Sequence, residues 1–305
     1  MNTAVQMGYS SQDRLLIVNA DDYGLCRSTN EGIIQLLSEN AVGSATIMMT
    51  CPWSSDAAAS ILQQAPTADV GVHWTLTSEW KAYRWGPLSR KHPTDTLTGQ
   101  DGWFPATIAD IEKGADPEQV RAELIAQTEA ALAAGLVLTH ADNHMGSLYG
   151  FNTGHDFLQV AFDVCAMYGL PFRLPRLLYS AGGRKIPWEL QQRAKLRTRQ
   201  AEDRGIVLPD YVTGPEFRLE PGETYGKMKA SGIAMLRGLL PGVTEWISHP
   251  STVTEELRSF HGAPDKRGME LMFWRDPEVR QALDEENIVM IGWRDLQRLQ
   301  ASLSI

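Results

Sequence analysis

Residues 15–26 read LLIVNADDYGLC, an apolar run that leads straight into two adjacent aspartates, Asp21 and Asp22. A short apolar run bounded by polar residues is typical of a buried strand in a parallel sheet. Two carboxylates at the end of such a strand have two interpretations: a surface turn ahead of Gly24, or a metal site. The remainder of the chain decides between them.

Outward from this stretch, short strand-like runs alternate with longer runs of helical period. The predicted strands are 14–20, 44–50, 69–77, 136–143, 171–176, 243–250 and 287–293, and the predicted helices are 28–43, 54–65, 116–135 and 155–169. Ser28 is the predicted N-cap of the first helix, with Glu31 completing a capping box. This alternation implies parallel strands joined by right-handed crossovers, and therefore an α/β fold, either a barrel or a doubly wound sheet.

Two segments interrupt the pattern. Residues 79–115 lose periodicity and collect Trp, Pro, Gly and Lys, which indicates a long insertion or lid. The basic segment 184–204 is most simply a solvated helical face. We therefore expect a single domain over 1–305, with a core of about 14–300 and the insertion at 79–115.

The composition narrows the classes of function. The 305 residues are 43% hydrophobic and 21% charged, which is enough apolar material for a sizeable core. The formal net charge of -9 argues against nucleic acid or an anionic membrane as the main partner, because both reward clustered lysine and arginine.

The cysteines and the N-terminus predict an unexported protein of a reducing cytoplasm. Cys26, Cys51 and Cys165 are odd in number and widely spaced, so they indicate neither a disulfide framework nor a CxxC metal knuckle. The N-terminal MNTAVQMGYSSQDR lacks a cationic start followed by an apolar core, and no later run approaches the roughly 20 apolar residues of a membrane span.

Acidic or imidazole groups lie within or just after the ends of four predicted strands, in NADD, HWTLT, THADNH and SHP. Ligands of α/β folds gather at the carboxyl ends of the strands, so these groups are expected to share one site. Taken alone, the aspartate pair could be a turn, and His73 could be a satisfied histidine near the core. Their shared position after strands favours a site.

The motif THADNH indicates a metal in either of two geometries. An extended chain places His140, Asp142 and His144 on one face, whereas a helix pairs the two histidines at i, i+4. Such groups are costly to desolvate without a cation or a partner. Carboxylate with imidazole suits Zn, Mn, Fe or Co, and Mg less naturally, and two imidazoles with one carboxylate leave positions open for water and substrate.

Four motifs carry a resemblance to a known family. VNADDYGLCRSTNEGI, GVHWTLT, THADNH and EWISHP, in this order within about residues 14–295, resemble the YdjC/ChbG family of carbohydrate deacetylases, relatives of the NodB-type polysaccharide deacetylases. The resemblance implies a distorted (β/α) barrel of TIM-barrel type. It also implies metal-dependent hydrolysis of an N-acetyl group on an amino sugar or chitooligosaccharide-like substrate, with one divalent ion, zinc being the first expectation and Mg, Mn, Co or Fe the alternatives.

The resemblance also implies roles for five residues. Asp22, His73 and His144 fall on the metal-ligand positions. Asp21 falls on the position of the base that activates the metal-bound water, and His249 on that of the general acid across the substrate. Adjacent strand residues point opposite ways, so the two aspartates share a site only if the chain turns at the strand end, and the sequence Tyr-Gly at 23–24 offers that turn.

Further residues are expected around this centre. His140 and Asp142 are placed behind the ligands, where they orient imidazoles, unless they only stabilise their loop. Arg173 in PFRLPR is expected to face the site. Trp80 and Trp85 of the insertion could stack on sugar faces or could pack the insertion onto the barrel.

Two other classes of function remain open: a metal-dependent phosphoesterase, and a sugar-binding protein without catalysis. Many family members carry further histidines after the DxH motif, where this chain reads Met145-Gly146-Ser147, so the substrate within the sugar class is open. The expected partner is a small carbohydrate. The oligomeric state is open, a homodimer included.

Overall fold

The computed structural model describes residues 2–179 and 186–303, in which strands and helices alternate as predicted. The strands are β1 Arg14–Tyr23, β2 Ser44–Ile47, β3 Asp69–Trp74, β4 Leu138–Asn143, β5 Tyr211–Thr213, β6 Gly242–Ser248 and β7 Ile288–Met290. The helices are α1 Thr3–Gln6, α2 Arg27–Ser38, α3 Ser54–Gln64, α4 Ile108–Gly114, α5 Pro117–Ala133, α6 Leu158–Tyr168, α7 Trp188–Glu202, α8 Tyr225–Arg237, α9 Glu255–Phe260, α10 Pro264–Arg275, α11 Pro277–Glu285 and α12 Trp293–Leu303, with the 3-10 turn η1 at His144–Gly146.

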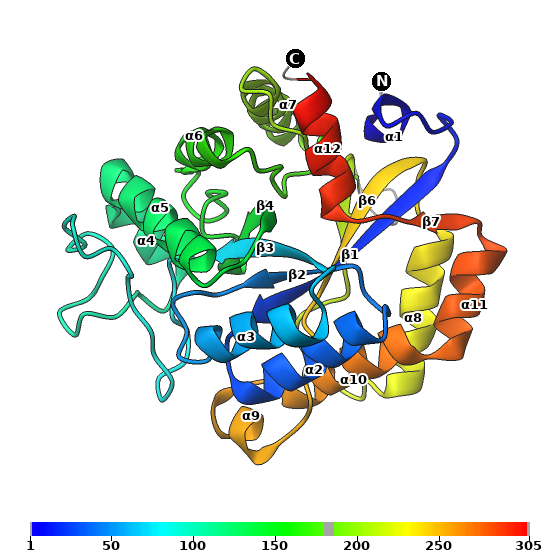
Figure 1. The fold of residues 1–305 in the computed structure, drawn as a ribbon, viewed down its shortest axis with the longest axis horizontal. Helices are drawn as coiled ribbons and strands as arrows, with labels where there is room; N and C mark the ends of the chain where they lie inside the picture. The colour runs from blue at the N-terminus through cyan, green and yellow to red at the C-terminus, as the bar shows by residue number, and fades with distance from the viewer. Residues whose placement is uncertain (1, 180–185, 304–305) are drawn as a thin grey trace.

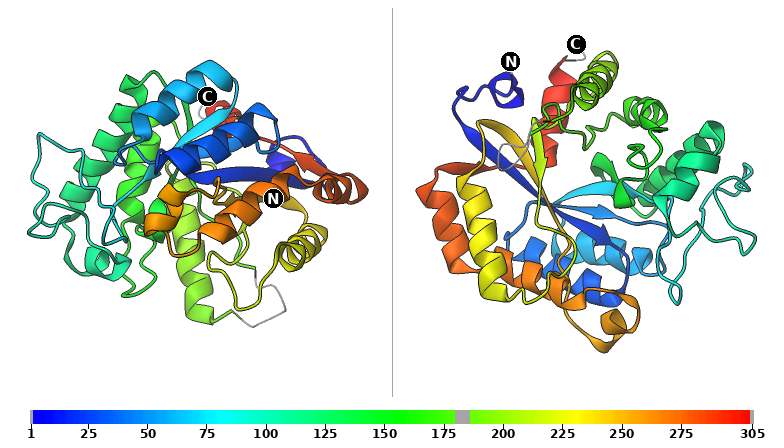
Figure 2. Two further views of the ribbon diagram at one scale, coloured as in Figure 1. Left: turned by 90° about the horizontal axis from the view of Figure 1, so that it is seen from below. Right: turned by 180° about the vertical axis from the view of Figure 1, so that it is seen from behind.

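The strands form one curled parallel sheet with helices around it (Figures 1 and 2). Its order is β4-β3-β2-β1-β6-β5, and β7 pairs with the start of β1. β1 lies at the centre and is buried at every residue after Arg14, because neighbouring strands and helices cover both of its faces. The predicted distorted (β/α) barrel is confirmed.

Residues 171–177 continue the curl of the sheet beyond β4. The predicted strand PFRLPR makes a single parallel bridge, between Ala141 and Phe172. The Phe172 amide then donates to Val207 O (3.3 Å), and the Arg176 amide donates to Pro209 O (3.0 Å), just ahead of β5. This irregular segment therefore joins the two edges of the sheet and carries Arg173 into the interior.

The first helix begins differently from the prediction. α2 starts at Arg27 with Cys26 at the N-cap, and Cys26 makes no side-chain cap bond. The Ser28 amide donates instead to the carboxylate of Glu256 at 2.9 Å. The predicted capping box is wrong because a carboxylate from a distant segment satisfies this helix end.

The two atypical segments are both packed onto the barrel in part. Residues 79–115 are irregular as far as α4, and they bury Trp85, Leu97 and Phe104; a lid function for them stays a prediction. The basic segment contains α7, although residues 184 and 185 lie outside the described part of the chain.

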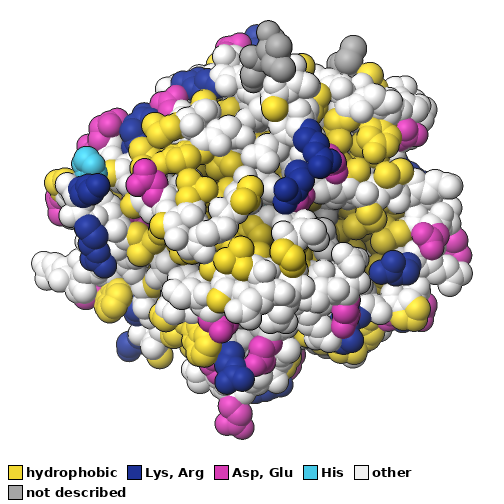
Figure 3. All heavy atoms as spheres, viewed as in Figure 1, with side chains coloured by type: hydrophobic (Ala, Val, Ile, Leu, Met, Phe, Trp, Pro, Cys, Tyr) yellow, Lys and Arg dark blue, Asp and Glu magenta, His cyan; other side chains and the backbone are white. Residues whose placement is uncertain are grey.

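On the face in Figure 3, lysine and arginine side chains are scattered among acidic ones. Within residues 2–179 and 186–303, no helix has the length and apolarity to cross a membrane. The three cysteines are buried and free of disulfides.

Candidate functional site

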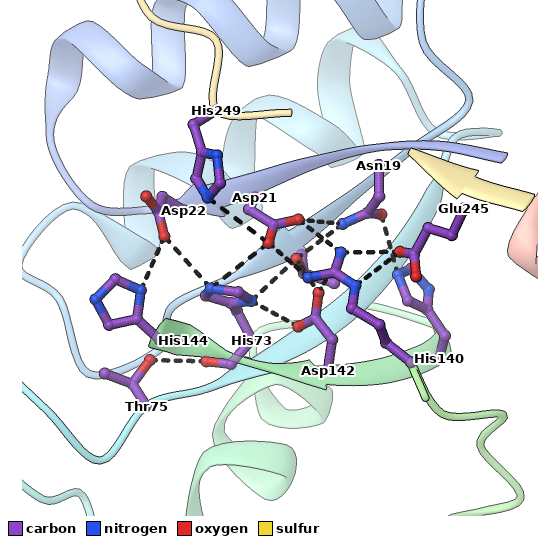
Figure 4. A network of polar contacts seen from close by, with 12 residues as sticks. Asn19, Asp21, Asp22, His73, Thr75, His140, Asp142, His144, Glu245 and His249 are labelled. Atoms are coloured by element: carbon purple, nitrogen blue, oxygen red, sulfur yellow. Dashed lines mark hydrogen bonds and ion pairs between the residues drawn. The ribbon is translucent and has the colours of Figure 1, made fainter. Parts of the chain in front are cut away.

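Two aspartates and two histidines meet where the strands end (Figure 4). Asp21 and Asp22 lie on β1, His73 lies on β3, and His144 opens the turn that follows β4. Asp22 Oδ1 lies 3.3 Å from His73 Nε2 and 3.1 Å from His144 Nδ1. Asp22, His73 and His144 are all buried and could hold a metal ion together.

A bulge in β1 brings both aspartates into this site. Asp22 has φ 67, a left-handed conformation that is unusual for a residue other than glycine. The register between β1 and β2 shifts between Ala20 and Tyr23, which is the mark of a bulge. The turn that we expected at residues 23–24 therefore begins one residue earlier, at Asp22 itself. Backbone strain of this kind concentrates at functional sites.

The donor set fits a divalent cation. Asp142 accepts a hydrogen bond from His73 Nδ1 (2.6 Å), so the lone pair of a neutral His73 lies on Nε2 and faces Asp22. Glu79 accepts from His144 Nε2 (3.1 Å), so the lone pair of a neutral His144 lies on Nδ1 and faces the same carboxylate oxygen. Lone pairs from three groups thus converge on one point, which requires a proton or a cation between them.

The raised pKa values of the two imidazoles also indicate that this cluster of groups favours a positive charge. Burial alone would lower the pKa of His73, but Asp142, Asp21 and Asp22 outweigh it and raise that pKa to about 10. Burial would likewise lower the pKa of His144, yet Glu79 and Asp22 raise it to about 9. A bound cation would satisfy these carboxylates in place of the extra protons.

The guanidinium of Arg173 binds Asp21 and turns it away from the point that Asp22 shares with the two histidines. Arg173 donates from Nη1 to Asp21 Oδ2 (2.6 Å) and from Nη2 to Asp21 Oδ1 (2.7 Å), and Asn19 donates to Oδ1 at 2.8 Å. Burial would raise the pKa of Asp21, but Arg173 and His73 hold it well below its usual range. Asp21 is therefore a fixed, ionised carboxylate, and its Oδ2 lies 4.0 Å from His73 Nε2.

Arg173 also connects Asp21 to the carboxylate behind His73. Its Nη2 lies 2.7 Å from Asp142 Oδ2 and 2.8 Å from Glu245 Oε1. Asp21, His73 and Asp142 form a second group with metal-ligand geometry, but the guanidinium already brings a positive charge to both of its aspartates.

His249 approaches from β6 and lies on the opposite side of Asp21 from His73 (Figure 4). Its Nε2 is 3.9 Å from Asp21 Oδ2, and its backbone amide donates to Glu270 at 2.7 Å. Its Nδ1 is buried without a hydrogen-bond partner. Burial lowers the pKa of His249, and the two aspartates offset this only in part.

His140 lies behind Asp21 and not behind a histidine. Its ring stacks on Trp293 with centroids 4.6 Å apart, and its Nε2 contacts Asn19 Oδ1 at 3.1 Å. Because η1 ends the strand at Asn143, the period-two spacing that grouped His140 with His144 does not extend to His144. His140 therefore acts on the site through Asn19, which bonds Asp21.

The aromatic residues of the insertion pack against the protein. Trp85 is 1% exposed, donates from its indole N–H to Thr77 O (2.7 Å), and lies edge-on to His144. Trp80 contacts Trp85 and also Phe260, whose centroid lies 5.0 Å away. Trp85 is therefore not available as a sugar platform, because burial against the barrel uses its ring.

Sequence reasoning missed two charged groups at the centre. Glu79 bonds His144, although it begins the segment that we treated only as an insertion. Arg267 of α10 lies 2.5 Å from Asp22 Oδ2, and together with His144 it holds the pKa of Asp22 well below its usual range against the effect of burial. A glutamate two residues after the strand end in HWTLTSE was a usable signal for Glu79. The sequence held no such signal for Arg267, because a charged residue in a helix is usually exposed.

Fold and site together define a parallel-stranded α/β barrel protein with a candidate metal centre at the carboxyl ends of its strands. The family model described as YdjC-like protein matches residues 15–285. The chain therefore belongs to the YdjC-like family, which confirms the resemblance stated from its motifs.

Named relatives match over almost the whole chain. A protein of Brevibacillus brevis named carbohydrate deacetylase is 34% identical over 282 residues, covering 92% of this chain and 99% of the relative. One of Thermoanaerobacter pseudethanolicus with the same name is 25% identical over 284 residues, covering 93% and 100%. A crystal structure from Enterococcus faecalis, of a candidate cellobiose-phosphate cleavage protein, superposes with a TM-score of 0.73 at 25% identity and covers 93% of this chain and 99% of that one.

Proposed function

We propose that this protein is a carbohydrate N-deacetylase, a single catalytic domain that hydrolyses the N-acetyl group of an amino sugar or chitooligosaccharide-like substrate with one bound divalent ion. The observation that carries the proposal is the division of work between the adjacent aspartates. Asp22 faces two imidazole lone pairs, whereas Asp21 is turned toward Arg173 and remains within reach of the same centre. The names of the relatives support the substrate class.

Asp22, His73 and His144 are the residues that would hold the ion. A divalent ion bound there lowers the pKa of water and polarises the amide carbonyl. Zinc suits one carboxylate and two imidazoles best, with Mn, Co, Fe or Mg as alternatives. Asp142 and Glu79 would fix the orientations of the two imidazoles through their outer nitrogens.

Asp21 and His249 would move the proton. Hydrolysis takes a proton from the attacking water and delivers one to the departing nitrogen. Asp21 would accept the first proton on Oδ2, and His249, whose Nε2 lies 3.9 Å from that oxygen, would carry a proton to the departing amine and regain one from Asp21. Arg173 keeps Asp21 ionised and oriented, so the carboxylate is a weak base that requires an acidified water.

The guanidinium of Arg173 argues against the two-metal phosphoesterase alternative. A second ion would need the group formed by Asp21, His73 and Asp142. Arg173 Nη2 lies 2.7 Å from both Asp21 and Asp142, so a second cation there would meet a fixed positive charge.

The test is product chemistry. The protein is incubated with a divalent metal and a panel of N-acetylglucosamine derivatives and N-acetylated chitooligosaccharides, and acetate is assayed. We expect acetate from at least one amino sugar. Release of phosphate from aryl phosphates, with no acetate from any member of the panel, would refute the proposed function.

A further inference from the structure

An aromatic side chain beside His249, that of Phe217, leaves most of its surface exposed to solvent. Phe217 is 58% exposed, yet its ring contacts the ring of His249 edge to face, with centroids 4.8 Å apart. Exposing so much of an aromatic ring forfeits the free energy that its burial would supply. Such a ring at the rim of a site is therefore suited to a ligand.

The loop that carries Phe217 is anchored on both sides of it. At its start, Gly214 lies so close to β6 that an added Cβ would come within 2.7 Å of Ile247 O. At its end, Glu223 pairs at 2.5 Å with the ammonium of Lys266, a lysine with a 2% exposed side chain. Both anchors belong to the walls of the site, since Ile247 is two residues from His249 and Lys266 precedes Arg267. The two ends of the loop that carries Phe217 are thus fixed by the fold.

The aromatic residues of the insertion, Tyr83 among them, pack against one another and against the protein. Tyr83 stacks on Phe260 with centroids 4.6 Å apart, and Trp80 and Trp85 complete the same cluster. On the other side of the aspartates, the residue after His144 is Met145, 45% exposed and in the left-handed region with φ 55. Exposed apolar surface at the site thus includes Phe217 beside the acid and Met145 beside the metal ligand.

We infer that Phe217 forms the subsite for the sugar ring that carries the reacting amide. The inference rests on the proposed function, in which His249 delivers a proton to the nitrogen on that ring. The group next to His249 on its solvent side is then the pyranose. A pyranose presents faces of C–H bonds, and such a face packs on an aromatic ring. Phe217 therefore contributes an apolar contact to the bound sugar ring.

The experiment compares the metal-loaded wild-type protein with the variants Phe217→Ala and Phe217→Trp. The control variant is Tyr9→Ala, which removes an exposed aromatic ring ahead of β1, away from the carboxyl ends of the strands. The substrate is N,N'-diacetylchitobiose. We expect Phe217→Ala to raise KM about tenfold, as one aromatic contact can, with kcat and metal content within about twofold of wild type. We expect Phe217→Trp to restore KM.

A KM in Phe217→Ala equal to that of Tyr9→Ala would overturn the inference while leaving the proposed function intact. Failure of the proposed function is recognised separately, because the wild-type protein would then release no acetate. Calorimetric binding of the disaccharide to Asp21→Asn, with and without Phe217→Ala, provides a readout that does not need turnover. Weaker binding without the ring supports the subsite, and equal binding overturns it.

Discussion

Replacing Arg173 by methionine should destabilise the protein strongly, and more at high pH than at low pH. The guanidinium is buried and contacts the carboxylates of Asp21, Asp142 and Glu245 at 2.6 to 2.8 Å. Removing one partner of a buried ion pair leaves an uncompensated charge and costs about 3–5 kcal/mol. With Arg173 present, burial already raises the pKa of Glu245 to about 7, the nearby aspartates adding to the effect and Arg173 opposing it. Without Arg173 this carboxyl can take up a proton near neutral pH and so relieve part of the cost.

The assay is urea-induced unfolding of wild type and Arg173→Met at pH 6 and pH 8. We expect the free energy of unfolding to fall by about 3–5 kcal/mol at pH 8 and by less at pH 6. Arg193→Met is the control, because Arg193 pairs with Asp156 at 2.9 Å but keeps a third of its side chain exposed, so its loss should cost no more than about 1 kcal/mol. A loss at pH 8 no larger than that of the control, or one equal at both pH values, would contradict the reasoning.

Three further outcomes follow from the same contacts. Asp21→Asn should lower kcat for acetate release by about a thousandfold, while metal analysis finds the metal content near that of wild type. An unchanged kcat would refute the role of Asp21 as the base. Glu79→Gln should weaken metal binding about tenfold in a titration, because His144 loses a charged partner; wild-type affinity would show that Glu79 does not act on the ligand. Glu245 has a folded-state pKa raised from 4.5 to about 7, so its contribution to stability is full below about pH 4.5 and is lost as the pH rises through 7. Glu245→Gln should remove that decline from the unfolding free energy, and an identical pH dependence in both proteins would argue against it.

The strands and the four polar motifs were predictable because each is a local pattern. The apolar run ahead of Asp21 forms the central strand, and the groups after β1, β3, β4 and β6 meet at one edge of the sheet, as parallel topology requires. The need for a turn between the two aspartates was also predictable. Its position was not, because Asp22 adopts the left-handed conformation as well as Gly24, and the bulge that requires this depends on pairing with β2.

What was missed depends on contacts between distant parts of the chain. Arg267 bonds Asp22 across 245 residues, and the helix that carries it gives no local sign that its guanidinium is buried. Glu256 satisfies the amide of Ser28 across 228 residues, which local capping rules cannot foresee. Local periodicity also joined His140 to His144, whereas the 3-10 turn at His144 re-aims that side chain.

Metal dependence of acetate release is the most direct test of the central claim. The chelator-treated protein is titrated with zinc, and bound metal and acetate from N,N'-diacetylchitobiose are measured on the same samples, with His144→Ala alongside. We predict that activity rises with occupancy and levels off at one ion per chain, and that His144→Ala binds the ion far more weakly. Acetate release that is undiminished in metal-free protein, or a His144→Ala variant with wild-type metal affinity, would contradict the account.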